Sequence, residues 1–123
     1  MSNILVTGAT GLCGTQIVKQ LSSSGHWIVV LSRRPVPPSN GDIHWIRADL
    51  TTLHQDVLDA SCGSVDTIVH FGAYVPLKED RARFEKCFAV NVDGLVRILQ
   101  WAVKKRVQTI IYASTCSVYG PLE

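Results

Sequence analysis

The sequence has no long hydrophobic run and no concentration of charge of one sign. A bilayer-spanning helix needs about 20 consecutive apolar residues, and no stretch of the chain approaches that length. The first apolar run ends at Val6 and has neither the length nor the basic leader of a signal peptide. The 12 Lys and Arg residues and 10 Asp and Glu residues are scattered and give a net charge of +2. We therefore expect no membrane segment, no secretion signal and no nucleic-acid partner.

Cysteine is sparse and unclustered. The four cysteines are Cys13, Cys62, Cys87 and Cys116, and no two of them form a Cys-x-x-Cys pair. Disulfide-rich secreted domains and zinc sites both need clustered ligands or a regular cysteine framework. The sequence therefore predicts reduced thiols, a cytoplasmic location and no metal site.

Strand-like and helix-like segments alternate along the 123 residues, and no linker or repeat divides them. The predicted strands are residues 3–7, 27–31, 43–47, 67–71 and 109–114, and the predicted helices are residues 12–24, 51–61 and 83–105. Such alternation with short connections predicts an α/β fold, a doubly wound, Rossmann-like parallel sheet between two layers of helices. We expect one domain over residues 1–123, with its five strands in the order 3-2-1-4-5.

One polar residue interrupts the apolar face of the predicted helix 83–105. That face consists of Phe84, Cys87, Phe88, Leu95, Ile98, Leu99 and Ala102, at steps of three and four residues. Asn91 lies within it. Because a buried amide without hydrogen-bond partners costs about 1–3 kcal/mol, Asn91 either braces neighbouring backbone or holds water near a ligand. The spacing alone leaves both interpretations open.

Three glycines join the first predicted strand to the first predicted helix, in residues 7–14 (TGATGLCG). Gly8 permits a tight turn out of the strand, Gly11 lets the backbone approach a pyrophosphate, and Gly14 lets the helix lie close to the sheet. The helix N-terminus offers unpaired N–H groups to phosphate oxygens. The spacing is G-x-x-G-x-x-G and not G-x-G-x-x-G. Its position between a strand and a helix predicts a dinucleotide-binding loop.

The residues that end the second predicted strand bear on the choice of dinucleotide. NAD-binding domains of this type usually have an acidic residue there, which binds the adenosine ribose 2′-hydroxyl. Here Ser32 is followed by Arg33 and Arg34. A guanidinium pairs with a 2′-phosphate through charge-assisted hydrogen bonds, whereas a carboxylate repels it. We predict NADP in preference to NAD, against the alternative that the two arginines form a solvated turn before Pro35.

Five motifs in chain order resemble those of the extended short-chain dehydrogenase/reductases, the superfamily of epimerase/dehydratase enzymes and several reductases. Residues 7–14 match the TGxxGxxG loop, and residues 48–50 (ADL) are similar to the acidic position that contacts the adenine. Residues 70–73 (HFGA) resemble the H-[FL]-A-[AG] segment that lines the cofactor. Residues 91–94 (NVDG) match N-V-x-G, and residues 114–120 (STCSVYG) resemble S-[ST]-x-x-V-Y-G.

The glycine loop, the arginines and this resemblance together place the site at the carboxyl ends of the strands, where open α/β sheets bind ligands. The predicted cofactor-binding residues are Gly8, Thr10, Gly11, Leu12, Cys13, Gly14, Ser32, Arg33, Arg34, Asp49, Leu50, Phe71, Gly72, Ala73, Asn91 and Ser114. The resemblance implies that Thr115 carries the catalytic hydroxyl, which hydrogen-bonds the reacting substrate oxygen. We interpret His70 as a packed strand-end residue rather than a base, and Trp27, Trp45 and Trp101 as core or sheet-face residues.

The catalytic pair of the family, Tyr-x-x-x-Lys on the helix after the fifth strand, has no match. In the family this lysine lowers the pKa of the tyrosine, whose phenol then acts as acid or base. Tyr74 and Lys78 have the spacing, but they precede Thr115 and adjoin Pro76, so we interpret them as accidental. We expect the 123-residue chain to bind its cofactor weakly and to be inactive by itself.

The leading hypothesis is the NAD(P)-binding portion of an epimerase, dehydratase or reductase, which transfers hydride between nicotinamide and a small-molecule substrate such as a nucleotide sugar. The alternative is a non-catalytic NADP-binding module or redox sensor. The missing tyrosine–lysine pair favours that alternative, whereas Thr115 favours enzyme ancestry. A flavodoxin-like FMN protein is disfavoured by the glycine loop and Arg33. The fifth strand would form an open sheet edge beside uncovered apolar helix faces, which predicts self-association.

Overall fold

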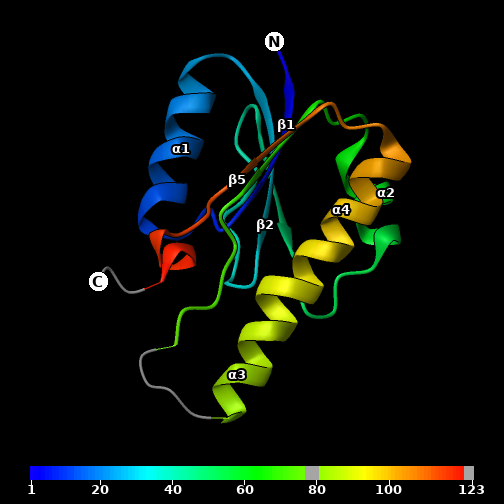
Figure 1. Cartoon of the computed structure of the whole chain (residues 1–123). Coiled ribbons are helices and arrows are strands. Elements are labelled where there is room, and N and C mark those ends of the chain that lie inside the picture. Colours follow the sequence, from blue (N-terminus) through cyan, green and yellow to red (C-terminus); the bar gives the residue numbers. More distant parts are fainter. Residues whose placement is uncertain (77–80, 121–123) are drawn as a thin grey trace.

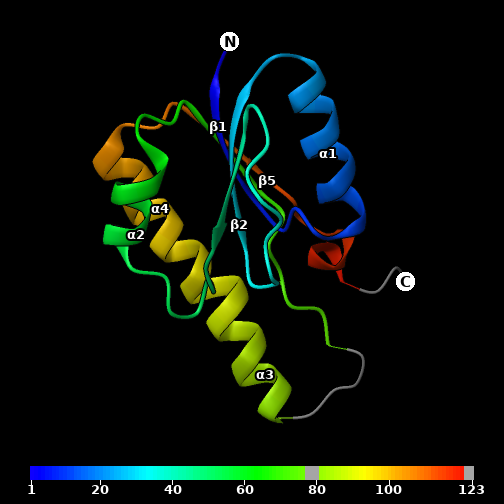
Figure 2. The same cartoon turned by 180° about the vertical axis from the view of Figure 1, so that it is seen from behind.

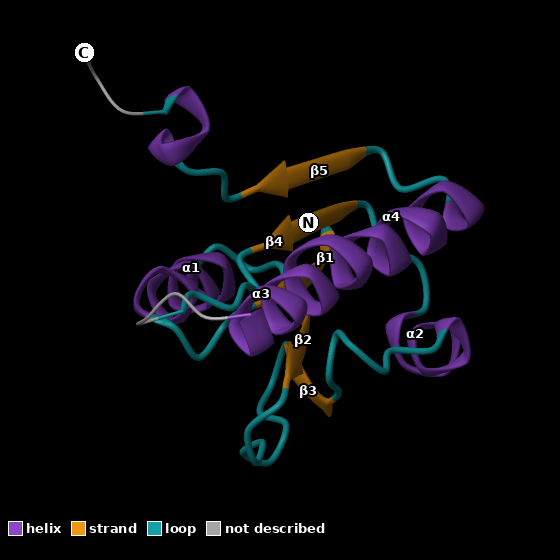
Figure 3. Ribbon diagram, turned by 60° about the horizontal axis from the view of Figure 1, so that its bottom comes forward, coloured by secondary structure: helices purple, strands orange, loops and turns teal. Residues whose placement is uncertain are grey.

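Five strands form one parallel sheet in the computed structural model, which describes residues 1–76 and 81–120. The strands are β1 (Asn3–Thr7), β2 (Trp27–Ser32), β3 (Ile43–Arg47), β4 (Thr67–His70) and β5 (Thr109–Tyr112). They lie in the order β3-β2-β1-β4-β5, and every neighbouring pair is parallel. Figure 3 shows the strands in this order, with β3 and β5 at the two edges. The predicted doubly wound α/β fold and its strand order are confirmed.

Helices cover both faces of the sheet, so the molecule has three layers (Figure 1, and from behind in Figure 2). α1 lies on one face, and α2, α3 and α4 lie on the other. The helices are α1 (Leu12–Ser23), α2 (Gln55–Cys62), α3 (Arg81–Phe88) and α4 (Gly94–Lys105), with a π-helical turn at Ala89–Asp93 and a 3-10 turn at Cys116–Tyr119. α3 extends beyond the end of the sheet to which the strands point (Figure 1). Among the described residues, no helix has the length and apolarity that a bilayer crossing requires.

Two apolar cores lie on the two faces of the sheet. Successive side chains of a strand point to opposite faces, and the central strands are apolar at nearly every position. Leu5 therefore packs in the core that contains Trp101 of α4, while Val6 packs in the core that contains Val18 of α1. The three tryptophans are buried or partly buried in these cores, as predicted: Trp27, Trp45 and Trp101.

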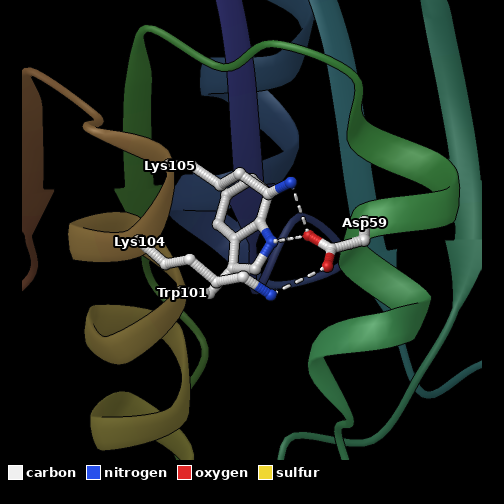
Figure 4. A network of polar contacts seen from close by, with 4 residues as sticks. All are labelled: Asp59, Trp101, Lys104 and Lys105. Carbon is white, nitrogen blue, oxygen red and sulfur yellow. Dashed lines mark hydrogen bonds and ion pairs between the residues drawn. The ribbon is translucent and has the colours of Figure 1, made fainter.

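A cluster of polar contacts at Asp59 connects α2 to α4 (Figure 4). The indole N–H of Trp101 donates to Oδ1 of Asp59 at 2.9 Å. Nζ of Lys105 lies 2.8 Å from the same oxygen, and Nζ of Lys104 lies 3.2 Å from Oδ2. These donors, Lys105 foremost, hold the pKa of the Asp59 carboxyl well below its usual range. The carboxylate thus anchors the C-terminal half of α4 against α2.

The predicted helix 83–105 is continuous, but the apolar face predicted for it is partly wrong. Phe84 is 68% exposed and Phe88 48% exposed, and Leu99 is exposed as well, whereas Ile98 is fully buried. The two phenylalanines lie on α3, which extends beyond the end of the sheet (Figure 1), so no core covers them there. The π-helical turn at Ala89–Asp93 inserts one extra residue between α3 and α4 and shifts the apolar positions of the two helices relative to each other.

The helix predicted at residues 51–61 begins later in the structure, and the strand predicted at residues 109–114 ends earlier. The predicted helix 51–61 begins at Gln55, because Oδ1 of Asp49 accepts the backbone N–H of Thr51 at 2.9 Å and the Thr51 hydroxyl at 2.8 Å. This turn occupies the backbone that the first helical turn would need. The predicted strand 109–114 ends at Tyr112, although the N–H of Ala113 still donates to the carbonyl of His70 at 3.1 Å.

Candidate functional site

A cavity of about 230 Å³ opens at the carboxyl ends of β1, β2, β3 and β4. Its lining residues are Thr7, Gly8, Thr10, Gly11, Leu31, Ser32, Arg33, Arg34, Ala48, Leu50, Phe71, Gly72, Ala73 and Val90. The lining combines apolar side chains with the glycine-rich backbone and two exposed arginines. This is the position at which an open parallel sheet offers a ligand crevice, beside the point where the strand order reverses.

Close packing requires two of the three glycines of residues 7–14. Gly8 has a positive φ of 73°, and a Cβ on it would lie 2.4 Å from the carbonyl carbon of Phe71. A Cβ on Gly14 would lie 2.1 Å from the carbonyl oxygen of Gly8. The loop after β4 and the first turn of α1 therefore approach β1 so closely that no side chain fits between them. Gly14 consequently packs α1 against the loop and does not line the cavity, in agreement with the reason given for it from the sequence.

Gly11 differs from these two, because it faces space. It is the N-cap residue of α1, and a Cβ on it would meet only the carbonyl oxygen of Gly8, at 3.4 Å. The first N–H groups of an α-helix have no acceptor within the helix, and they point towards the loop that Gly11 opens. A diphosphate fits this cradle, because bare backbone and the positive end of the helix dipole meet there.

The hydroxyl of Thr7 connects the glycine loop to the loop after β4. Its Oγ1 lies 2.8 Å from Nδ1 of His70 and accepts the backbone N–H of Gly72 at 3.0 Å. His70 is buried, and burial lowers the pKa of its imidazole below the ordinary value of 6.5. Its ring also stacks on that of Tyr112 of β5. The interpretation of His70 as a packed strand-end residue is confirmed.

Asn91 braces the backbone of Tyr74. Its Oδ1 accepts the N–H of Tyr74 at 2.7 Å, and its Nδ2 donates to the carbonyl oxygen of the same residue at 2.9 Å. Asn91 lies in the π-helical turn, and Lys86, five residues earlier in α3, places Nζ 4.5 Å from the centre of the Tyr74 ring. Of the two interpretations that the sequence left open, the backbone brace is the one observed. Asn91 thus holds the segment that follows Ala73 and does not itself line the cavity.

The end of β2 supplies the charged rim. Arg33 and Arg34 are exposed and line the cavity, and the buried Ser32 turns the chain there, because its Oγ accepts the N–H of Arg34 at 3.1 Å. Asp49 lies beside the cavity. The N–H of Thr51 foremost lowers the pKa of the Asp49 carboxyl, and the nearby charge of Arg33 acts in the same direction. The rim therefore combines two guanidinium groups with one ionised carboxylate.

Several predicted site residues lie away from the cavity lining. Those outside it are Leu12, Cys13, Gly14, Asp49, Asn91, Ser114 and Thr115. The first two are exposed on the first turn of α1, and Thr115 is exposed in the segment after β5, at the edge of the sheet. Lys78, the partner in the accidental spacing with Tyr74, lies outside the described residues.

Four lining residues were absent from the predicted set: Thr7, Leu31, Ala48 and Val90. Thr7, Leu31 and Ala48 stand at or just after strand ends, a signal that was available from the sequence. Val90 precedes Asn91 in a helix, and only the π-helical turn and the packing of that helix bring it to the cavity.

The comparison with known proteins agrees with this geometry. The model of the NAD dependent epimerase/dehydratase family matches residues 4–123. The chain is similar to 3 beta-hydroxysteroid dehydrogenase/Delta 5-->4-isomerase of Mycobacterium tuberculosis, at 32% identity across 96% of this chain and 33% of that protein. It is similar to UDP-glucose 4-epimerase of Neisseria meningitidis, at 28% identity across 98% of this chain and 38% of that protein.

Solved structures give the same result. MoeE5 in complex with UDP-glucose and NAD is similar with a TM-score of 0.84 and 32% identity, across 98% of this chain and 39% of that chain. Uronate dehydrogenase from Agrobacterium tumefaciens is similar with a TM-score of 0.77 and 25% identity, across 94% and 41%. The chain spans about a third of the length of the curated relatives it matches. With its Rossmann-like sheet, its glycine loop and a family match over nearly all of its residues, this chain belongs to the NAD dependent epimerase/dehydratase family.

Proposed function

We propose that this chain is the NAD(P)-binding portion, over residues 1–123, of an extended short-chain dehydrogenase/reductase, and that its cavity holds the adenosine end of the dinucleotide. The observation that carries the proposal is the junction of bare backbone at Gly8 and Gly11 with a cavity whose lining includes apolar side chains, such as Leu50, and two arginines. Pockets for whole drug-sized ligands measure about 300–1,000 Å³, so a cavity of about 230 Å³ suits one nucleoside rather than a complete dinucleotide. The relatives whose structures contain NAD support the same assignment.

In this proposal each part of the site has a separate task. Backbone N–H groups at the start of α1 bind the diphosphate beside Gly11, whose own N–H donates to the carbonyl oxygen of Gly8, and Leu50 with Val90 encloses the adenine. Leu12, Cys13 and Ser114 contribute backbone or edge contacts outside the cavity. A bound nicotinamide would supply hydride transfer. Asn91 keeps the loop after β4 in place, so that Phe71, Gly72 and Ala73 form a fixed wall.

We further propose NADP in preference to NAD, on the basis of Arg33 and Arg34. Both side chains are exposed on the cavity rim, where they can pair with a ribose 2′-phosphate. NAD remains the second candidate, because the similar structures are complexes with NAD and because the ionised Asp49 partly balances Arg33.

Calorimetric titration with 2′,5′-ADP and with 5′-AMP tests the preference, because the two ligands differ only in the 2′-phosphate. We expect 2′,5′-ADP to bind at least tenfold more tightly, since a charge-assisted pair contributes about 1.5–3 kcal/mol. Arg34→Ala and Arg33→Ala should each remove most of that difference while leaving 5′-AMP affinity unchanged. Lys19→Ala, which removes an exposed cation on α1, is the control. Equal affinities in the unmodified protein would contradict the NADP assignment but leave the dinucleotide site intact.

For the whole protein, we propose hydride transfer between nicotinamide and a hydroxyl or carbonyl substrate such as a nucleotide sugar, with Thr115 hydrogen-bonding the reacting oxygen. The relatives named above, an epimerase that acts on UDP-glucose and a structure that contains UDP-glucose, support this substrate class. A non-catalytic NADP-binding module is the alternative. The scattered cysteines favour a cytoplasmic location.

We also propose that the 123-residue chain associates with a second copy of itself through β5. All four residues of this edge strand are exposed, and Ile110, Ile111 and Tyr112 give it an apolar surface. Their unpaired N–H and C=O groups offer a template for another strand. No proline or charged residue interrupts the edge between Thr109 and Tyr112.

A further inference from the structure

Leu50 occupies a notch between two glycines that lie far apart in the sequence. The side chain is buried and lines the cavity. A Cβ on Gly94, the first residue of α4, would lie 2.9 Å from Cβ of Leu50 and 3.5 Å from its carbonyl oxygen. A Cβ on Gly72 would lie 2.9 Å from Cδ1 of Leu50. Contacts below 3.0 Å are essentially never made by real Cβ atoms. Cδ1 of Leu50 is the flexible end of the side chain and can move away from Gly72, but Cβ of Leu50 cannot do so without the backbone, so Leu50 keeps this position only while Gly94 lacks a side chain.

The two glycines differ in their relation to the ligand space. Gly72 lines the cavity and is also close to Thr7, so a side chain at residue 72 would itself occupy part of the cavity. Gly94 is buried and does not line the cavity. Its effect on the site can therefore pass only through the residues that it contacts.

The start of α4 holds Leu50 at a second point. Nη1 of Arg97 donates to the carbonyl oxygen of Leu50 at 3.4 Å, a long hydrogen bond. Residues three apart share one face of a helix, so Gly94 and Arg97 both meet the segment after β3. Val90, four residues before Gly94, forms another part of the cavity wall. Residues 90–97 thus contribute Val90 to the cavity lining and also contact Leu50, another lining residue, through Gly94 and Arg97.

The geometry points to Gly94 as a positioning residue for the adenosine end of the dinucleotide site. Because Gly94 lacks a side chain, Leu50 can pack directly against the start of α4, and the space between Leu50 and Val90 stays open for the ligand. This inference rests on the proposed function, because it takes the cavity to be the adenosine site. It assigns a physical reason to the last glycine of the N-V-x-G motif, namely the depth of a pocket formed by other residues.

Calorimetric titration with 5′-AMP tests the inference. In Gly94→Ala the new methyl group separates Leu50 from α4, and we expect AMP to bind about tenfold more weakly, the scale of overpacking a well-packed site. Leu50→Gly removes the atom that the methyl group would meet. In that background, adding Gly94→Ala should cause no further loss of affinity. An unchanged AMP affinity in Gly94→Ala, or an equal loss in both backgrounds, would overturn the inference.

Arg97→Ala supplies an independent variant for the case that Gly94→Ala does not fold. Arg97 is only partly buried, so its loss should leave folding intact while freeing the backbone of Leu50, and AMP should bind about two- to threefold more weakly. An unchanged affinity there would count against the role of α4. A wild-type chain that does not bind AMP overturns the proposed function itself, whereas a wild type that binds AMP no better than Gly94→Ala overturns only the positioning role.

Discussion

The hydroxyl oxygen of Thr7 lies 2.8 Å from Nδ1 of His70, and this contact joins the last residues of β1 and β4. The same oxygen accepts the N–H of Gly72, so one hydroxyl contacts both the imidazole and the loop after β4. The two strands on either side of the cavity are thereby held in register exactly where their loops diverge to form its walls.

Thr7→Val tests the energetic importance of this hydroxyl. The substitution keeps the shape of the side chain but leaves Nδ1 of His70 and the N–H of Gly72 without their partner. We expect the free energy of unfolding, measured with urea, to fall by about 1–3 kcal/mol. Thr7→Ser retains the hydroxyl and should lose clearly less. Equal losses in the two variants would show that packing of the methyl group, and not the hydrogen bonds, is what matters.

The stability of the chain should fall between pH 7 and pH 5 because of His70. Burial lowers the pKa of this imidazole in the folded state below the ordinary 6.5, so the unfolded state binds more protons as the pH drops through 6.5. The free energy of unfolding should then decrease by up to about 1.4 kcal/mol per pH unit. Urea unfolding at several pH values should show a shallower slope in His70→Gln. His54→Gln, at an exposed histidine, should keep the wild-type slope; a slope that is identical in His70→Gln would contradict this account.

Gly8 and Gly25 form a matched pair for separating backbone strain from steric conflict. Their φ angles are 73° and 75°, but a Cβ on Gly8 would collide with the backbone of Phe71, whereas a Cβ on Gly25 meets nothing within 4 Å. Gly25→Ala should therefore cost about 1 kcal/mol of unfolding free energy, the price of a left-handed conformation alone. Gly8→Ala should cost about 1–3 kcal/mol more and abolish 5′-AMP binding. If urea unfolding gave the same loss of unfolding free energy for Gly8→Ala and Gly25→Ala, the loop after β4 would be able to move away from a new Cβ at residue 8 at little cost.

Asp59 should stabilise the contact between α2 and α4 in a salt-dependent way. Asp59→Asn keeps an oxygen that can accept the indole N–H of Trp101 but loses the attraction to Lys104 and Lys105. We expect a lower melting temperature at low salt and a smaller difference from wild type at 1 M salt. Asp59→Ala also leaves the buried indole N–H unpaired, so it should melt lower than Asp59→Asn at both salt concentrations. A loss in Asp59→Asn that is independent of salt would contradict an electrostatic origin.

A charged residue on the edge strand should reduce self-association. Ile111→Lys places a charge in the middle of β5, where Ile111 is 51% exposed, and lysines at sheet edges oppose strand pairing. Light scattering should give a larger average mass for the wild type than for the variant. Val103→Lys, which adds the same charge to an exposed site on α4, is the control for a general gain in solubility. A monomeric wild type at high concentration would refute the proposed association.

Several features were predictable because they depend on neighbours in the sequence. The alternation of apolar runs and amphipathic segments predicted the strands, the helices and the doubly wound parallel sheet. Gly8 and Gly14 were predictable for the same reason, since a turn between a strand and a helix has few steric solutions. Gly25 likewise ends α1 with a positive φ, as expected for a residue just beyond a helix.

Other features depend on contacts between distant residues. Asn91 became a brace only because its helix lies beside the loop of Tyr74. Phe84 is exposed because α3 extends beyond the end of the sheet (Figure 1), a position that periodicity does not reveal. Leu50 has its position because Gly72 and Gly94 converge on it from other elements. By itself the sequence determined the fold, the glycine loop and the family motifs, because these arise from local spacing and strand periodicity. Only the tertiary structure decided which side chains line the cavity and which hold the lining residues in place. That division depends on how segments far apart in the sequence pack against each other, and the local sequence pattern carries no information about this packing.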